Sequence, residues 1–86
     1  MHEIPIEDSI DLHTFLPDEI HIVVEEYLHQ AGERGFREVR IIHGRGVGVQ
    51  RDIVHSILRK HPAVKSFRDE IDLGSTMVTL QPVIQV

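Results

Sequence analysis

The sequence "EVRIIHGRGVGVQRDIV", Glu38 to Val54, joins a strand-like run to a helix-like pattern across a glycine-rich turn. The residues of Glu38–Ile42 favour a strand, and only Arg40 breaks the apolar run inside it, which is typical of a central strand. After the turn, apolar residues recur at helical spacing, at Val49, Ile53, Val54, Ile57 and Leu58. This helix should end before Pro62, because the residue preceding a proline avoids the α region. The segment therefore predicts a strand, a turn and a helix.

The flanking sequence extends the same alternation in both directions. Upstream, Ser9–His13 is expected to be a strand, and Pro17 opens a helix with acidic residues in its first turn. That helix carries one apolar stripe, formed by Ile20, Val23, Val24, Tyr27, Leu28 and Ala31. Downstream, Ala63–Phe67 and Thr76–Leu80 are expected to be strands, and the short connection between them predicts a hairpin.

The expected order is β-α-β-α-β-β. Alternating elements favour parallel strands with right-handed crossovers, and two helices are too few to cover both faces of a four-stranded sheet. The sequence therefore predicts an α/β two-layer sandwich, with a four-stranded mixed sheet and both helices on one face. We place the domain at residues 9–81, between an N-terminal extension (1–8) and a C-terminal tail (82–86).

Composition limits the class of protein. The 86 residues suffice for one small domain, and 41% apolar with 27% charged residues is typical of a globular chain. No apolar run reaches the ~18 to 20 residues that a membrane span needs, so no membrane partner is expected. The chain lacks a secretory signal pattern and cysteine, which favours a cytoplasmic protein without disulfides or thiolate metal sites.

The charges are segregated along the chain. Its net charge of −5 argues mildly against nucleic-acid binding, but residues 1–32 hold eight acidic residues and no lysine or arginine. Residues 33–60 hold seven basic and three acidic residues, and this basic segment contains the glycine turn. Local charge matters more than net charge within a Debye length of roughly 8 Å.

A candidate site lies where the first two strands end. Sites in parallel α/β sheets form beyond the carboxyl ends of the strands, so Asp11 and His13 should meet His43 at one edge. The following helix begins directly after the glycine turn, and its free N–H groups favour an anion. Gly44, Gly46 and Gly48 would let the backbone approach a phosphate, and Arg45 would add a charge-assisted contact.

Simpler interpretations stand beside this one. A glycine-rich turn is often only a tight connection, and the spacing fits neither the Walker motif nor the dinucleotide-binding fingerprint. A single histidine is more often structural than catalytic. A zinc site at Asp11, His13 and His43 lacks supporting spacing. Three further histidines lie off the apolar helix faces and should be solvated: His21, His29 and His55.

Three segments together resemble the Smr (small MutS-related) domain family: "IDLHTFLPDEI", "EVRIIHGRGVGVQRDIV" and "GSTMVTL". The resemblance spans roughly Ile10 to Leu80, and the two family signatures correspond to Ile10–Thr14 and His43–Gly48. It implies a sandwich similar to the C-terminal domain of a bacterial translation initiation factor. It also implies nucleic-acid binding, with endonuclease or nicking activity in several members. Thr14 replaces the usual glycine, and the double-glycine loop before the last strand is missing.

This leaves three hypotheses. In the first, the chain cleaves phosphodiester bonds in structured DNA or RNA, with Asp11, His13 and His43 as catalytic residues. The phosphate contacts would be Gly44, Arg45, Gly46, Gly48 and Arg51, and Asp11 could also hold a divalent metal, Mg or Mn. In the second, the same residues bind nucleic acid without catalysis. In the third, the acidic N-terminal part docks a protein partner.

Overall fold

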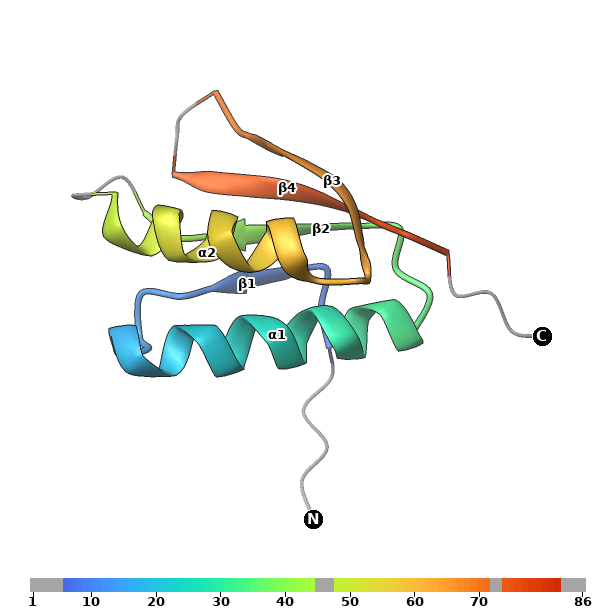
Figure 1. Cartoon of the computed structure of the whole chain (residues 1–86), viewed down its shortest axis with the longest axis horizontal. Coiled ribbons are helices and arrows are strands. Elements are labelled where there is room, and N and C mark those ends of the chain that lie inside the picture. Colours follow the sequence, from blue (N-terminus) through green and yellow to red (C-terminus); the bar gives the residue numbers. More distant parts are fainter. Residues whose placement is uncertain (1–5, 45–47, 72–73, 83–86) are drawn as a thin grey trace, which may run out of the picture.

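The computed structural model describes residues 6–44, 48–71 and 74–82. Its elements follow one another as predicted (Figure 1): β1 (Ser9–Asp11), α1 (Pro17–Glu33), β2 (Glu38–Ile42), α2 (Val49–Lys60), β3 (Val64–Asp69) and β4 (Ser75–Leu80). The two-layer sandwich expected from the sequence is thereby confirmed.

The sheet is mixed, with the strand order β1-β2-β4-β3. β1 lies parallel to β2, whereas β4 runs antiparallel to both β2 and β3. Both helices pack side by side on one face of this sheet (Figure 1). The carboxyl ends of β1 and β2 therefore lie next to each other, at the edge of the sheet where α2 begins.

The core lies between the helices and the sheet. Val39 and Ile41 are fully buried toward the helices, while Arg40 between them is exposed on the opposite face. The core also contains the apolar stripes of both helices, Leu12 directly after β1, and Val78 and Leu80 of β4. Burying each such side chain stabilises the fold by about 1.5–3 kcal/mol, so strand register is set by this alternation.

Helix ends follow the local signals in the sequence. α1 begins at Pro17, where Oε1 of Glu19 accepts a hydrogen bond from the Leu16 N–H at 2.9 Å. α2 ends at Lys60, because His61 adopts an extended conformation before Pro62. None of the helices in the described ranges is long and apolar enough to cross a membrane.

Two of the strand boundaries that differ from the prediction matter for the site. β1 ends at Asp11 instead of His13, because the chain turns there and the Phe15 N–H donates to the Leu12 carbonyl. β3 continues beyond Phe67 to Asp69, which pairs with Thr76 of β4. Two predicted phosphate contacts, Arg45 and Gly46, lie outside the described residues.

Candidate functional site

Asp11 and His13 form an exposed pair at the end of β1. Nδ1 of His13 lies 2.7 Å from Oδ1 of Asp11, and the backbone N–H of His13 donates to the same oxygen at 3.0 Å. These two hydrogen bonds, the backbone one first, lower the pKa of Asp11 below its ordinary value. The His13 and Asp11 side chains are 74% and 48% exposed. Nε2 of His13 has no hydrogen-bonding partner among the described residues, so it faces solvent as an oriented, free nitrogen.

The pair lies beside the glycine turn. Asp11 is the register partner of Ile42, and the Leu12 N–H donates to the Ile42 carbonyl at 2.9 Å. Because Leu12 is fully buried, its neighbours Asp11 and His13 point away from the core. The last residues of β1 and β2 thus place the pair and the start of the turn at the same edge.

The turn is bracketed by two glycines with left-handed backbones. Gly44 has a φ of +84° and Gly48 a φ of +82°, a region in which other residues are strained. Gly48 is the N-cap of α2 and has no side chain to accept from the first N–H groups of the helix. At α1 the Glu19 carboxylate bonds the N-cap N–H. Within the described part of the chain no side chain at the N-cap position bonds these N–H groups, so the N-terminus of α2 offers them to an anion.

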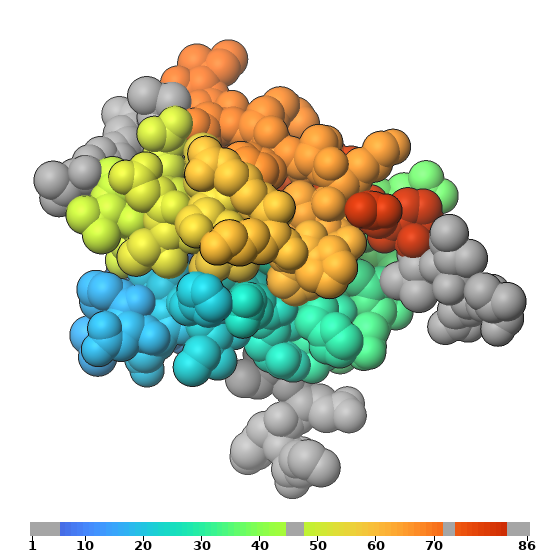
Figure 2. Space-filling view, viewed as in Figure 1, coloured from blue at the N-terminus to red at the C-terminus, as the bar shows by residue number. Residues whose placement is uncertain are grey.

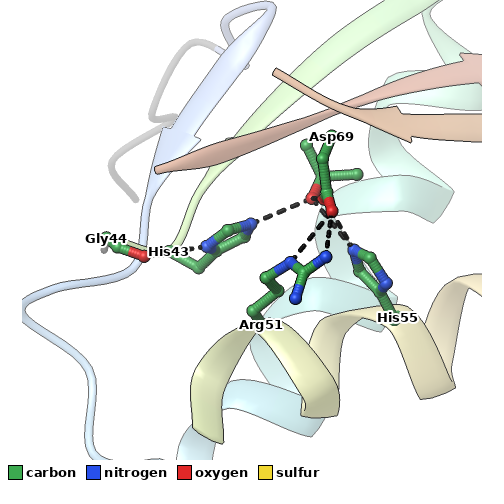
Figure 3. Close-up of polar contacts among 6 residues, drawn as sticks. His43, Gly44, Arg51, His55 and Asp69 are labelled. Carbon is green, nitrogen blue, oxygen red and sulfur yellow. Dashed lines mark hydrogen bonds and ion pairs between the residues drawn. The ribbon is translucent and has the colours of Figure 1, made fainter. Parts of the chain in front are cut away.

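His43 directly follows β2, and its side chain is buried in the core. Only 6% of it is exposed, and it continues the inward-facing row of Val39 and Ile41. Nε2 lies 2.9 Å from Oγ1 of Thr76, and Nδ1 lies 3.1 Å from the Gly44 carbonyl oxygen (Figure 3). Both ring nitrogens of His43 are therefore engaged in holding neighbouring strands and the start of the turn.

Asp69 is the centre of a cluster that also contains His43, Arg51, His55 and Thr76, which we call the buried cluster. No pattern in the sequence indicated Asp69 as a site residue. Its carboxylate accepts from Arg51 Nε at 2.9 Å and from a second Arg51 nitrogen. It also accepts from the Thr76 hydroxyl and from His55 Nε2, each at 2.9 Å (Figure 3). Arg51 above all, and then Thr76 and His55, hold the pKa of Asp69 well below its usual range. Arg51, expected as an outer phosphate contact, thus has a carboxylate partner inside the domain.

The expectation that His55 is solvated was wrong. Its side chain is only 15% exposed, and its ring packs edge-on against Phe67 with centroids 5.0 Å apart. α2 turns the face that carries Arg51 and His55 toward the end of β3 and the start of β4. Their i, i+4 spacing was the signal available in the sequence. Asp69, which both residues contact, was not predicted because β3 was expected to end two residues earlier. His21 and His29, the other two histidines of that prediction, are exposed to solvent as expected.

The buried cluster also contains three potential metal ligands. Ligand atoms of His43, His55 and Asp69 lie within 4.8 Å of one another. The Arg51 guanidinium already supplies the positive charge beside Asp69, and every buried polar side-chain atom of the described residues has a hydrogen-bonding partner. The cluster is therefore complete as a hydrogen-bonded network without an ion.

The three residues that the sequence predicted to converge are divided between two arrangements. Asp11 and His13 contact each other at the surface, whereas His43 belongs to the buried cluster. Among the described residues, no hydrogen bond or ion pair joins His43 to Asp11 or His13.

The fold and the site together define a class: small two-layer α/β domains with a histidine–aspartate pair beside a glycine turn at the ends of two parallel strands. The model of the Smr domain matches residues 10–81, and the chain belongs to this family.

Relatives of known name and structure agree with this assignment. The chain is 40% identical over 85 residues to the endonuclease MutS2 of Caldicellulosiruptor saccharolyticus, covering 94% of this chain and 11% of that protein. It is 42% identical over 80 residues to the endonuclease MutS2 of Caldicellulosiruptor bescii, covering 88% and 10%. The chain thus spans about a tenth of the curated relatives that it matches.

Two crystal structures share the fold. The Smr domain of Thermus thermophilus MutS2 matches with a TM-score of 0.82 and 30% identity, over 88% of this chain and 100% of that one. YdaL, a stand-alone small MutS-related protein from Escherichia coli, matches with a TM-score of 0.74 and 26% identity, over 90% and 66%.

Proposed function

We propose that this domain binds DNA or RNA and hydrolyses a phosphodiester bond at the Asp11–His13 pair. The observation that carries the proposal is the exposed His13 ring, held by Asp11 through Nδ1 at 2.7 Å, with Nε2 directed to solvent. An imidazole fixed in this way by a carboxylate is a suitable general base. Relatives named endonuclease MutS2 support the choice of substrate and reaction.

The reaction would proceed in one displacement at phosphorus. Nε2 of His13 accepts a proton from the attacking water or hydroxyl, whose oxygen forms the new bond to phosphorus. The bond from phosphorus to the leaving oxygen breaks, and at this exposed site the leaving oxygen can take its proton from solvent. The Asp11 carboxylate fixes the ring and stabilises the imidazolium that forms.

The glycine turn would hold the phosphate. The uncapped N–H groups that begin α2 after Gly48 point out of the helix end and favour a negative charge. Arg45 and Gly46 remain proposed phosphate contacts from the sequence, because they precede that helix end by only a few residues. These donors would stabilise the charge that develops on the phosphate oxygens.

His43 and Arg51 would act through the position of the turn. His43 holds the Gly44 carbonyl through Nδ1, while Arg51 ties the first turn of α2 to Asp69. Because both His43 nitrogens are bonded and the ring is buried, we assign it a positioning role in preference to proton transfer. Mutating either residue should then weaken phosphate binding through the turn.

A divalent ion has one fitting donor at this site. Oδ1 of Asp11 is occupied by His13, whereas Oδ2 has no partner among the described residues. We propose that Oδ2 would contact hydrated Mg²⁺ or Mn²⁺, which prefer carboxylate and water oxygens and would supply charge to the phosphate.

The outer face of α1 supports an alternative, a protein-docking function. This helix has no lysine or arginine and exposes Asp18, Glu19, Glu25, Glu26 and Glu33. Ile22 lies among them with 70% of its surface exposed. Such a face repels phosphate and suits a basic partner with an apolar contact. Under this alternative, a folded protein would neither bind nor cleave nucleic acid.

The test compares His13→Ala with His21→Ala. His21 is a matched control because it is also exposed and also lies near a carboxylate, 3.5 Å from Glu25. Each protein is incubated with supercoiled plasmid and with structured RNA at low salt, with and without magnesium or manganese. We expect His13→Ala to lose about 10²- to 10⁴-fold in cleavage rate while it keeps its affinity. Equal cleavage by both variants would exclude His13 as the base.

A further inference from the structure

Among the residues that the structure describes, the positive charges of the basic segment are not concentrated at the glycine turn. Arg40 pairs with Glu70, Arg51 with Asp69 and Arg68 with Glu38. Of the lysine and arginine residues that the structure describes, the others form no ion pair with a described residue, and all are exposed: Arg34, Arg37, Arg59, Lys60 and Lys65. We call these five residues the basic end.

The basic end lies at the opposite pole from Asp11 and Gly48. Arg34 caps the end of α1, Arg59 and Lys60 close α2, and Arg37 directly precedes β2. The ends of both helices meet the starts of β2 and β3 on the right of Figure 1, away from the glycine turn. Figure 2 shows these segments adjoining at that end of the surface.

Arg37 and Lys65 line one cavity at the basic end. Gly32 and Gly35 from the α1 terminus, with Thr79 and Leu80 of β4, form other parts of its wall. Lys65 is the extra residue of an irregularity in β3, because Val64 pairs with Leu80 and Ser66 with Thr79. A bulge of this kind redirects a side chain out of the regular alternation. At this irregularity in β3, Lys65 adds a second positive charge to the cavity that Arg37 lines.

Helix stability alone does not explain this charge. Arg59 and Lys60 do oppose the negative end of the α2 dipole. Arg37 and Lys65 precede or begin strands, so no helix dipole accounts for them. Within the described part of the cavity wall Glu33 is the acidic residue, and it is engaged with His29 at 3.1 Å.

We propose that the basic end is a second phosphate-binding surface, which holds the nucleic-acid backbone at a distance from the Asp11–His13 pair. This inference rests on the proposed function and adds where the substrate is held and how long it must be. The negative charge of the phosphates complements the positive charges of Arg37 and Lys65. The acidic face of α1 repels phosphate, so we expect the nucleic acid to follow a path that avoids this helix. α1, with 17 residues, is roughly 25 Å long. A duplex that reaches from one end to the other must therefore have at least about seven base pairs.

The test measures counterion release. Binding of a roughly 20-base-pair duplex is followed by fluorescence anisotropy from low to high salt, for wild type, Arg37→Gln/Lys65→Gln and Arg40→Gln/Arg68→Gln. The last variant removes the same charge from two arginines that are already paired. We expect the slope of log K against log salt to fall by about 1.8 for the first variant and by much less for the control.

The outcomes separate the two proposals. Equal slopes for the two double variants would overturn the proposal that the basic end binds phosphate, even if wild type binds and cleaves. Wild-type binding with the expected slopes but no cleavage would support phosphate binding by the basic end and overturn the hydrolysis mechanism. A wild type that binds no duplex would refute both. Should Arg37→Gln/Lys65→Gln not fold, Arg59→Gln/Lys60→Gln serves the same comparison, with an expected loss of similar size.

Discussion

The hydroxyl of Thr76 lies 2.9 Å from Nε2 of His43, and this contact ties the end of β2 to the start of β4. The same hydroxyl donates to Asp69 at 2.9 Å, so one side chain also reaches the end of β3. Because His43 in turn holds the Gly44 carbonyl, the position of the glycine turn depends on a contact inside the core.

Thr76→Val should destabilise the domain. Valine keeps the shape of threonine but leaves Nε2 of the buried His43 without a partner, which costs about 1–3 kcal/mol in the free energy of unfolding. Urea denaturation measures the change. Thr79→Val is the control, because Thr79 is on the same strand but faces the opposite side of the sheet. Equal stability of the two variants would show that the Thr76 hydroxyl contributes nothing.

Asp69→Asn should destabilise the domain in a pH-dependent way. The folded-state pKa of Asp69 is depressed below its ordinary value of about 3.9, so its stabilisation is complete above that pH. It is lost as the pH falls further, toward the folded-state pKa. We expect a loss of about 1–3 kcal/mol at neutral pH, discounted for the partly exposed Arg51, that shrinks steadily below about pH 4. Unfolding curves at several pH values measure it, with exposed Glu7→Gln as a flat reference. A loss that is the same at every pH would contradict an ionised Asp69.

Gly48→Ala and Gly32→Ala should have opposite effects on stability. No atom lies within 4 Å of a Cβ at Gly48, but its φ of +82° makes alanine cost about 1–2 kcal/mol. Gly32 lies within α1, where a new Cβ meets Ala63 Cβ at an ordinary 3.8 Å. Alanine there should stabilise by about 0.5–1 kcal/mol. Thermal unfolding of the two variants provides the comparison, and a stable Gly48→Ala would mean that the turn relaxes freely.

Asp11→Asn should slow cleavage without affecting affinity. The amide no longer offers a negative charge to the imidazolium, and losing a hydrogen bond of about 1.5 kcal/mol corresponds to about a tenfold slower reaction. Single-turnover kinetics with the most readily cleaved substrate measure the rate. Asp52→Asn, an exposed acid at the start of α2, controls for the loss of charge near the turn. An unchanged rate in Asp11→Asn would mean that His13 needs no carboxylate.

The sequence determined the fold because hydrophobic periodicity is a local property. The stripe of α1, the apolar run of β2 and the glycines at 44 and 48 each report on the nearby backbone, and the order of elements left few topologies. It also determined the Asp11–His13 pair, since two residues that flank a buried Leu12 must point to the same side.

Only the tertiary structure decided the role of the remaining polar residues. Asp69 and His55 are 14 positions apart, and each is polar in a way that predicts solvent exposure when it is considered alone. Their contact depends on where β3 ends and on how α2 rotates against the sheet, and both are set by packing between distant segments. Likewise, the seven bases of residues 33–60 formed one basic segment in the sequence. Folding paired Arg40 and Arg51 with acidic residues of the β3 region and left unpaired cations at the opposite end from the turn. Charge in a sequence is additive, but its neutralisation depends on which partners the fold brings within a few ångströms.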